Sequence, residues 1–152
     1  MARKTENYHL RIPSQTANLQ VIRNFVSDVA KSVGFENKDI GKIELAVDEA
    51  CTNVIEHAHH QDTKQDIDVA VKIDYDKFTV VITDHGKGFK PEDVDIPDMN
   101  RYLAELRVGG LGIYLMKHLM DEVEYHTQPG VSNEVRMVKY LLRKDKKKKQ
   151  SL

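Results

Sequence analysis

A carboxylate and an amide share one edge of a predicted helix. Glu49, Asn53 and His57 are spaced at i, i+4 and i+8, and this spacing stacks side chains along a helix. The edge borders the apolar face of the helix, so its polar groups can face a cleft between helix and sheet. A carboxylate there can accept a proton from an attacking hydroxyl, and an amide oxygen can hold a magnesium ion. Ordinary solvated side chains are the competing interpretation.

An aspartate and two glycines follow a hydrophobic strand. The segment runs Thr83-Asp84-His85-Gly86-Lys87-Gly88. An aspartate at a strand end can present a buried carboxylate to a flat heterocycle that carries an amino group, and glycines let the backbone approach that ring. A simple glycine turn after a strand is the alternative.

A second glycine cluster opens another predicted helix. Gly109, Gly110 and Gly112 precede the apolar run that starts at Ile113. Glycines before a helix expose backbone N–H groups that can cradle phosphate, and the helix dipole favours negative charge there. The chain has no G-x-x-x-x-G-K-[ST] or G-x-G-x-x-G motif, and no H-R-D or D-F-G motif of the ordinary eukaryotic protein kinases. A flexible hinge is the other interpretation.

Metal and redox chemistry have little support in the sequence. His57, His59 and His60 suggest a metal ion, but no cysteine or third ligand stands at a motif spacing. Cys51 is the single cysteine, so no internal disulfide can form. It lies among the apolar residues of a predicted helix, where a buried, unreactive thiol is expected.

The elements that would position these residues form an α+β pattern. Strand-like alternation covers residues 66–75, with Asp76-Lys77 as a hairpin turn into a strand at 78–83. Apolar spacing predicts the first helix over 14–33, ended by Gly34, and Asn37 is expected to cap a second helix that reaches about His59. The remaining predicted elements are a strand at 8–12, a loop at 89–108, a helix at 113–120, and strands at 122–127 and 134–142. This order predicts a two-layer sandwich, with helices on one face of a mostly antiparallel sheet.

Size and charge fit one soluble domain. The chain has 152 residues and a net charge of −1, so no global field points to nucleic acid or to a membrane. It has no apolar run of about 18 residues and no signal-peptide pattern, and a cytoplasmic location is expected. We assign residues 1–143 to the domain and expect 144–152, which carries a lysine run, to be a disordered basic tail.

Together, in this order, the three motifs resemble a known nucleotide site. Glu-x-x-x-Asn on a helix, Asp-x-Gly-x-Gly after a strand and Gly-x-Gly opening a helix are similar to the boxes of the superfamily that includes gyrase, histidine kinases and MutL. The segments Glu44–Asn53 and Leu119–Val123 resemble the anti-sigma factor serine/threonine kinases of bacteria. The resemblance spans nearly the whole chain, from Leu19 to Leu142.

The resemblance implies a Bergerat-type fold that binds ATP and Mg²⁺ and phosphorylates Ser or Thr on an anti-sigma-factor antagonist protein. Glu49 would be the general base, Asn53 the magnesium ligand, and Asp84 the partner of the adenine amino group. Gly86 and Gly88 would shape the base pocket. The phosphates would be wrapped by the loop Val108, Gly109, Gly110, Leu111 and Gly112.

Partners are also implied by the resemblance. Members of the family dimerise and bind sigma factors, so a homodimer and a sigma-factor partner are expected, with no direct contact to nucleic acid. Arg23 lies about where the family places an arginine that contacts a partner. A solvated charge on a helix face is the alternative for Arg23.

Two departures from the family pattern stand out. Arg107 is separated from Gly109 by Val108, whereas the family often has Glu-Arg immediately before the glycines. The family's late Gly-Thr is replaced by Ser132-Asn133-Glu134.

Three other functions stay open: a nucleotide-sensing protein that sequesters a partner without catalysis, a metal-dependent hydrolase using the histidines, and a kinase that acts on a switch partner and never binds a sigma factor.

Overall fold

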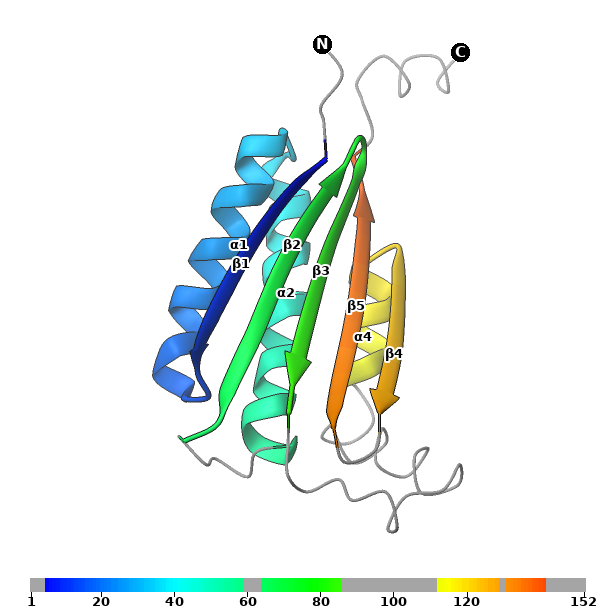
Figure 1. Cartoon of the computed structure of the whole chain (residues 1–152). Helices are drawn as coiled ribbons and strands as arrows, with labels where there is room; N and C mark the ends of the chain where they lie inside the picture. Colours follow the sequence, from blue (N-terminus) through cyan, green and yellow to red (C-terminus); the bar gives the residue numbers. More distant parts are fainter. Residues whose placement is uncertain (1–4, 59–63, 86–111, 129–130, 142–152) are drawn as a thin grey trace, which may run out of the picture.

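Two layers make up the structure, a computed structural model that describes residues 5–58, 64–85, 112–128 and 131–141. Five strands form one sheet in the order β1-β2-β3-β5-β4, and every neighbouring pair is antiparallel. The helices α1, α2 and α4 cover one face of this sheet (Figure 1). The predicted α+β sandwich is therefore confirmed.

The strands follow the period of two seen in the sequence. Their bounds are β1 Glu6–Pro13, β2 Asp66–Asp74, β3 Lys77–Asp84, β4 Glu122–Gln128 and β5 Ser132–Tyr140. In β2 the apolar positions Ile67, Val69, Val71 and Ile73 are fully buried, while Lys72 and Asp74 between and beyond them are exposed. Because alternate side chains point to opposite faces, this strand turns its apolar set to the helices.

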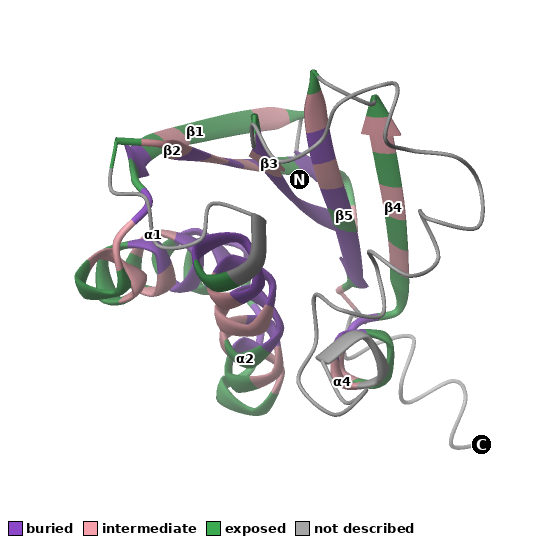
Figure 2. Ribbon diagram, turned by 90° about the horizontal axis from the view of Figure 1, so that it is seen from below, coloured by how far each residue is buried: buried purple, intermediate pink, exposed green. Residues whose placement is uncertain are grey.

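The helices bury apolar stripes against that inner face. Their bounds are η1 Thr16–Asn18, α1 Leu19–Val33, α2 Asn37–Asn53, η2 Val54–Ala58 and α4 Gly112–Leu119. Buried residues gather between the two layers (Figure 2). Phe35, just before α2, packs edge-on against Phe78 of β3, with ring centroids 5.3 Å apart. Aromatic rings favour this arrangement.

The start of α2 corrects one expectation. Asn37 is the first helical residue, and Glu36 is the cap, with extended backbone and no capping side-chain hydrogen bond. The backbone N–H groups of Asp39 and Ile40 donate to the Glu36 carbonyl oxygen instead. Phe35 is buried, and its anchorage in the core fixes where the chain enters the helix.

The first hairpin corrects a second expectation. Lys77 pairs with Asp74, so the loop is Tyr75-Asp76 and not Asp76-Lys77. Tyr75 takes the left-handed conformation, with φ of 57°, which a two-residue hairpin loop requires. This register keeps Phe78 opposite Ile73 inside the core. A slip by one residue would turn the apolar side chains of β3 outward.

The start of α1 and the end of α2 also differ from the sequence prediction. The first helix is preceded by the separate 3-10 turn η1, and the α-helical hydrogen bonding of α2 stops at Asn53. The chain continues through η2, a π-helical turn that includes His57. Such turns have more residues per turn, so His57 does not continue the regular i, i+4, i+8 stripe.

Gly34 and Gly41 offer matched tests of this fold. Gly34 ends α1 with φ of 112°, and its N–H donates to the carbonyl oxygens of Ala30 and Lys31. Gly41 lies exposed inside α2, and a Cβ built there meets no atom within 4 Å. We expect Gly34→Ala to lower the free energy of unfolding by about 1–2 kcal/mol because alanine is strained at that φ. Gly41→Ala should raise it by about 0.5–1 kcal/mol. Urea unfolding of both variants measures this, and shifts of the same sign would contradict it.

Candidate functional site

Polar residues replace apolar ones at one end of the inner face of the sheet. The antiparallel register places Asp84 of β3 opposite Asn133 of β5, and Asn133 opposite Thr127 of β4. The neighbouring row along the same face is Ile82, Val135 and Tyr125. We call Asp84, Asn133 and Thr127 the polar row. It forms the end of the inner face where β3 and β4 finish.

A hydrogen bond joins the side chains of Asp84 and Asn133. The Asn133 Nδ2 group donates to Asp84 Oδ1 over 3.1 Å, and Asn133 is 9% exposed and Asp84 4%. A carboxylate that is removed from water must be held by donors. The predicted buried carboxylate at the strand end is therefore present, and its partner comes from a segment 49 residues later in the chain.

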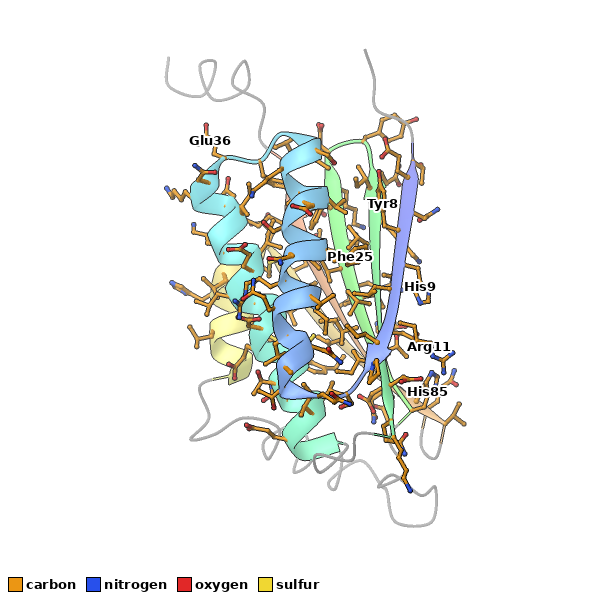
Figure 3. All side chains as sticks on the ribbon, turned by 90° about the vertical axis from the view of Figure 1, so that its left-hand side faces the viewer. Tyr8, His9, Arg11, Phe25, Glu36 and His85 are labelled. Carbon is orange, nitrogen blue, oxygen red and sulfur yellow. The ribbon has the colours of Figure 1, made fainter. Side chains whose placement is uncertain are left out.

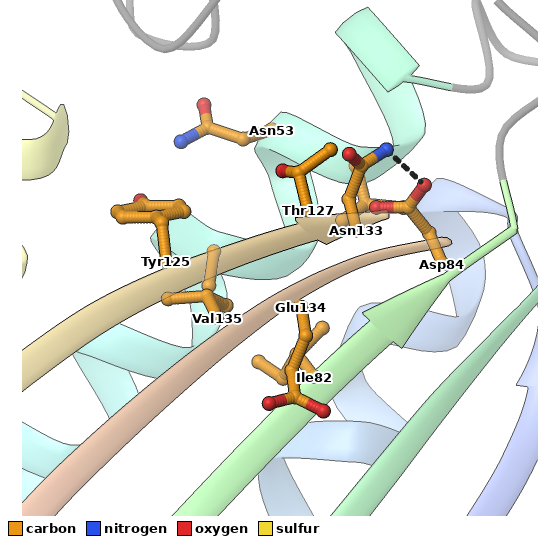
Figure 4. A pocket seen from close by; sticks show the side chains of 10 residues that line it. Asn53, Ile82, Asp84, Tyr125, Thr127, Asn133, Glu134 and Val135 are labelled. Atoms are coloured by element: carbon orange, nitrogen blue, oxygen red, sulfur yellow. Dashed lines mark hydrogen bonds between the residues drawn. The ribbon is translucent and has the colours of Figure 1, made fainter. Parts of the chain in front are cut away.

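The polar row borders a cavity between the sheet and α2. Asn53 enters it from α2, and the apolar walls include Ala50, Val54 and Ile82. Figure 4 shows Asp84, Asn133 and Thr127 rising from the strands on the side of Asn53, while Glu134 points away. The cavity thus combines apolar walls with a small number of polar groups, as ligand sites do.

Asn53 has an unusual environment for an amide. It is 5% exposed, and within the described part of the chain its Nδ2 atom is buried without a hydrogen-bond partner. An unsatisfied buried polar group costs about 1–3 kcal/mol. It also lies at the residue where α2 changes to the π-helical turn η2, and such turns are frequent at functional sites. Asn53 therefore brings to the cavity a polar group that no neighbour in the described part of the chain satisfies.

Glu49 lies one helical turn before Asn53 on α2. It is partly exposed, and the residues that line the cavity in the described ranges do not include it. Of the predicted pair, the Asn53 amide lies in the interior and the Glu49 carboxylate lies nearer to solvent. That position suits a group that meets a second macromolecule.

Most residues of the two glycine motifs lie outside the described part of the chain. The described residues do not include Gly86, Gly88, Arg107, Val108, Gly109, Gly110 and Leu111, nor His59 and His60. Gly112 is the first residue of α4. The start of α4, the end of β3 and the η2 end of α2 lie at the same end of the molecule (Figure 1). The sequence motifs on these three elements therefore meet at one end of the fold.

His85 follows Asp84 but lies on the other side of the sheet. Its Nε2 atom is 3.5 Å from Asp68 Oδ2, and its Nδ1 atom is 3.3 Å from the Val131 carbonyl oxygen. His9 and Arg11 of β1 approach the same Asp68 carboxylate, and the side chains of His9, Arg11 and His85 project away from the helices (Figure 3). Alternation along the strand therefore separates His85 from the cavity.

Arg23 is held within the protein. Its Nη2 and Nε atoms donate to Asp48 Oδ2 over 2.6 and 3.0 Å, joining α1 to α2 beside Glu49. The hydrogen bond to Asp48 raises the pKa of Arg23. The Arg23 side chain keeps 33% of its surface exposed, so the ion pair still leaves a charged edge at the surface.

Two further predictions concern metal and thiol chemistry. Within residues 5–58, 64–85, 112–128 and 131–141, no group of three or more His, Cys, Asp or Glu side chains could hold a metal ion. Cys51 is fully buried, as expected, and burial raises the pKa of its thiol. Also within the described part, no helix is long and apolar enough to cross a membrane.

Asn133 and Thr127 are site residues that sequence reasoning missed. Neither stands in the glycine boxes, and both reach the site through strand register alone. The replacement of the expected Gly-Thr by Ser132-Asn133-Glu134 was a visible signal at that position. That Asn133 faces Asp84 follows only from the pairing of β3 with β5, which the sequence did not predict.

Comparison with known proteins agrees with the geometry. Residues 12–139 match the model of the histidine kinase-like ATPase domain. The serine-protein kinase RsbW of Bacillus velezensis is 33% identical, over 93% of this chain and 89% of that protein. RsbW of Bacillus subtilis is 32% identical with the same coverage, and RsbW of Bacillus pumilus is 36% identical, over 88% of this chain and 85% of that protein.

Solved structures share the fold. A crystal structure of the RsbU and RsbW domains of a Mycobacterium tuberculosis protein matches 91% of this chain and 33% of its own, with a TM-score of 0.65 and 17% identity. The SiaB–SiaC complex of Pseudomonas aeruginosa matches 86% of this chain and 88% of its own, with a TM-score of 0.64 and 13% identity. On its sequence and its fold, the chain belongs to the histidine kinase-like ATPase domain family, among the relatives of the bacterial serine-protein kinase RsbW.

Proposed function

We propose that this protein is an ATP-dependent protein serine/threonine kinase that phosphorylates an anti-sigma-factor antagonist. The observation that carries the proposal is the polar row with Asn53 beside it, at the cavity of a histidine kinase-like ATPase fold. The relatives named serine-protein kinase support the reaction class.

The cavity supplies the base end of the nucleotide site. Ile82, Val135 and Tyr125 give a heterocycle apolar surface to lie against. The buried Asp84 carboxylate supplies an acceptor for an exocyclic amino group, as adenine has at position 6. A site built to hydrogen-bond such a group rejects analogues that lack it, because its polar atoms would then be left unpaired.

The phosphate end lies toward the start of α4. Gly112 begins that helix, and the N-terminal end of a helix offers N–H groups and a positive partial charge to phosphate. Gly109 and Gly110 of the preceding loop would add backbone N–H groups, with Val108 and Leu111 on either side. Gly86 and Gly88 would let the chain after β3 approach the base.

Asn53 fits the magnesium ion that kinase chemistry requires. Its amide is buried at the cavity, and the oxygen of that amide is the atom that can ligate a cation. Mg²⁺ takes oxygen ligands and keeps several waters, so the Asn53 side-chain oxygen would hold it together with phosphate oxygens. When bound, the ion would neutralise charge on the phosphates.

Glu49 would complete the reaction from the solvent side. The incoming Ser or Thr hydroxyl oxygen forms a bond to the terminal phosphorus, and the bond from that phosphorus to the bridging oxygen of ADP breaks. The hydroxyl proton passes to the Glu49 carboxylate. Because Glu49 is partly exposed one turn from Asn53, it can meet a side chain presented by another protein.

The partner proposals follow the relatives. The SiaB–SiaC neighbour is itself a two-protein complex, which supports an antagonist protein as the substrate. We extend the proposal to a homodimer that also binds a sigma factor. Arg23, fixed by Asp48 and one-third exposed, would contact a partner beside Glu49.

Glu49→Gln tests the proposed base. It should lower phosphate transfer to the antagonist by about 10²–10⁴-fold because the amide cannot accept the proton, while ATP affinity changes little. Glu36→Gln, at the exposed opposite end of α2, is the matched control. Transfer from radiolabelled ATP and calorimetric ATP binding are measured side by side. Undiminished transfer by Glu49→Gln would remove Glu49 from the mechanism.

Asp84→Asn tests the base end. The amide would weaken ATP binding by about 10–100-fold, since it presents a donor or a poorer acceptor to the adenine amino group. Asp74→Asn is the control, because Asp74 is exposed at the far end of β2. Titration calorimetry gives both affinities. Equal ATP affinity of Asp84→Asn and the parent would place the base elsewhere.

A further inference from the structure

A second cavity lies at the end of the protein opposite to the proposed nucleotide site. It has a volume of about 560 Å³, and its walls come from the start of α2, from the turn after α4 and from the end of β5. Glu36, which lines it, and His85, which follows Asp84, lie at opposite ends of the molecule (Figure 3). Small-molecule sites commonly enclose about 300–1,000 Å³, so this cavity has room for a ligand.

Lys139 is the most deeply buried charged residue of this cavity. It is 8% exposed, because the register of β5 on β3 turns it to the inner face opposite Phe78. Its Nζ atom donates a hydrogen bond of 2.9 Å to the Leu119 carbonyl oxygen. Among the described residues, Lys139 forms that bond and no ion pair. A lysine ammonium has three N–H donors, so two of them are left for the cavity.

The bond to Leu119 compensates only part of the charge of Lys139. Leu119 is the last residue of α4, and the C-terminal end of a helix carries a negative partial charge that favours a cation. A buried ammonium without a counter-charge still has a large desolvation cost. The oxygen of an anionic ligand would provide both the counter-charge and acceptors for the remaining N–H groups.

Two further lysines line the same cavity. Lys38 and Lys42 are four residues apart on α2, so their side chains lie along one edge of the helix. Lys42 is half-buried and Lys38 is exposed. Three ammonium groups at increasing exposure therefore border the cavity, and lysines of this kind are common ligands of phosphate.

The carboxylates of the lining are less buried than Lys139. Glu36 and Asp121 are exposed, and Asp39 is half-buried. Asp121 Oδ2 already accepts a hydrogen bond from the backbone N–H of Tyr140 over 2.7 Å. The one charge that lies out of contact with water is thus positive, so the group that fits beside it is negative.

We propose that this cavity binds a small molecule that carries a phosphate or carboxylate group, with an oxygen of that group on Lys139 Nζ. Lys42 adds positive charge nearer to solvent. The burial of Lys139 favours a small molecule, since a protein surface laid over this end would reach mainly the exposed Lys38. The site is independent of the proposed kinase activity, which uses the other end of α2.

NMR titration with inorganic phosphate, and separately with acetate, tests the site. Each anion replaces chloride at constant ionic strength, and the backbone amides are followed one by one. We expect saturable shifts at Asp121 and Tyr140, which line the cavity, with a Kd of about 1–10 mM for the anion that fits better. That anion identifies the charged group of the ligand. Shifts that do not saturate with either anion, or that appear only at the start of α4, would overturn the proposal.

Lys139→Met removes the buried charge and keeps an apolar chain of similar length. It should weaken binding of the better anion by about tenfold or more, as expected for the loss of a charged hydrogen bond. Lys72→Gln is the control for net charge, because Lys72 is exposed on the outer face of β2 and does not line the cavity. Equal affinity of Lys139→Met and the parent would assign Lys139 to the end of α4 alone.

Lys42→Gln keeps the test decisive if Lys139→Met does not fold, which thermal unfolding checks. Lys42 is half-buried on α2 and forms no part of the apolar core. Its loss should weaken anion binding by about threefold or more, and an unchanged Kd would contradict the site. ATP binding is measured on the same samples. Saturable anion binding without ATP binding would leave this site standing and overturn the nucleotide site, and the reverse result would do the opposite.

Discussion

The antiparallel register of β3 on β5 places Asp84 opposite Asn133, and the chemistry of the site depends on that alignment. Phe78, Val80 and Ile82 hold the register, since each is essentially fully buried on the inner face. A shift of one residue would expose that apolar set and turn the Asp84 carboxylate away from the cavity. The packing of these apolar residues therefore positions the Asp84 carboxylate, which is not itself part of the apolar core.

The polar row and Asn53 together have an energetic cost that a ligand can offset. A buried carboxylate and two buried amides lower stability unless they are hydrogen-bonded. Asn133 provides part of the compensation for Asp84, while Asn53 keeps a nitrogen unmatched within the described residues. Most of the inner face beyond them is apolar and stabilises the fold, and Lys139, opposite Phe78, is buried there with its Nζ donating to the Leu119 carbonyl oxygen. Asp84, Asn133 and Asn53 thus lie together at the end of the fold where β3 and α2 finish.

The sequence predicted the parts of this protein that depend on local patterns. Period-two alternation located β2 and β3, helical spacing located α1 and α2, the Glu-x-x-x-Asn spacing marked Asn53, and the glycine boxes marked Asp84 and Gly112. Features set by tertiary pairing were not predicted. Asn133 faces Asp84 only through the strand register, and Arg23 meets Asp48 only through the packing of α1 on α2. The cap of α2 was placed one residue late because the burial of Phe35 decides where that helix begins.

A crystal structure of the protein with a non-hydrolysable ATP analogue tests the central claim most directly. The account predicts the base in the cavity between α2 and the sheet, with its 6-amino group hydrogen-bonded to the Asp84 carboxylate. The terminal phosphates should lie toward the start of α4. A nucleotide bound at another surface, or a base that does not contact Asp84, would contradict the account.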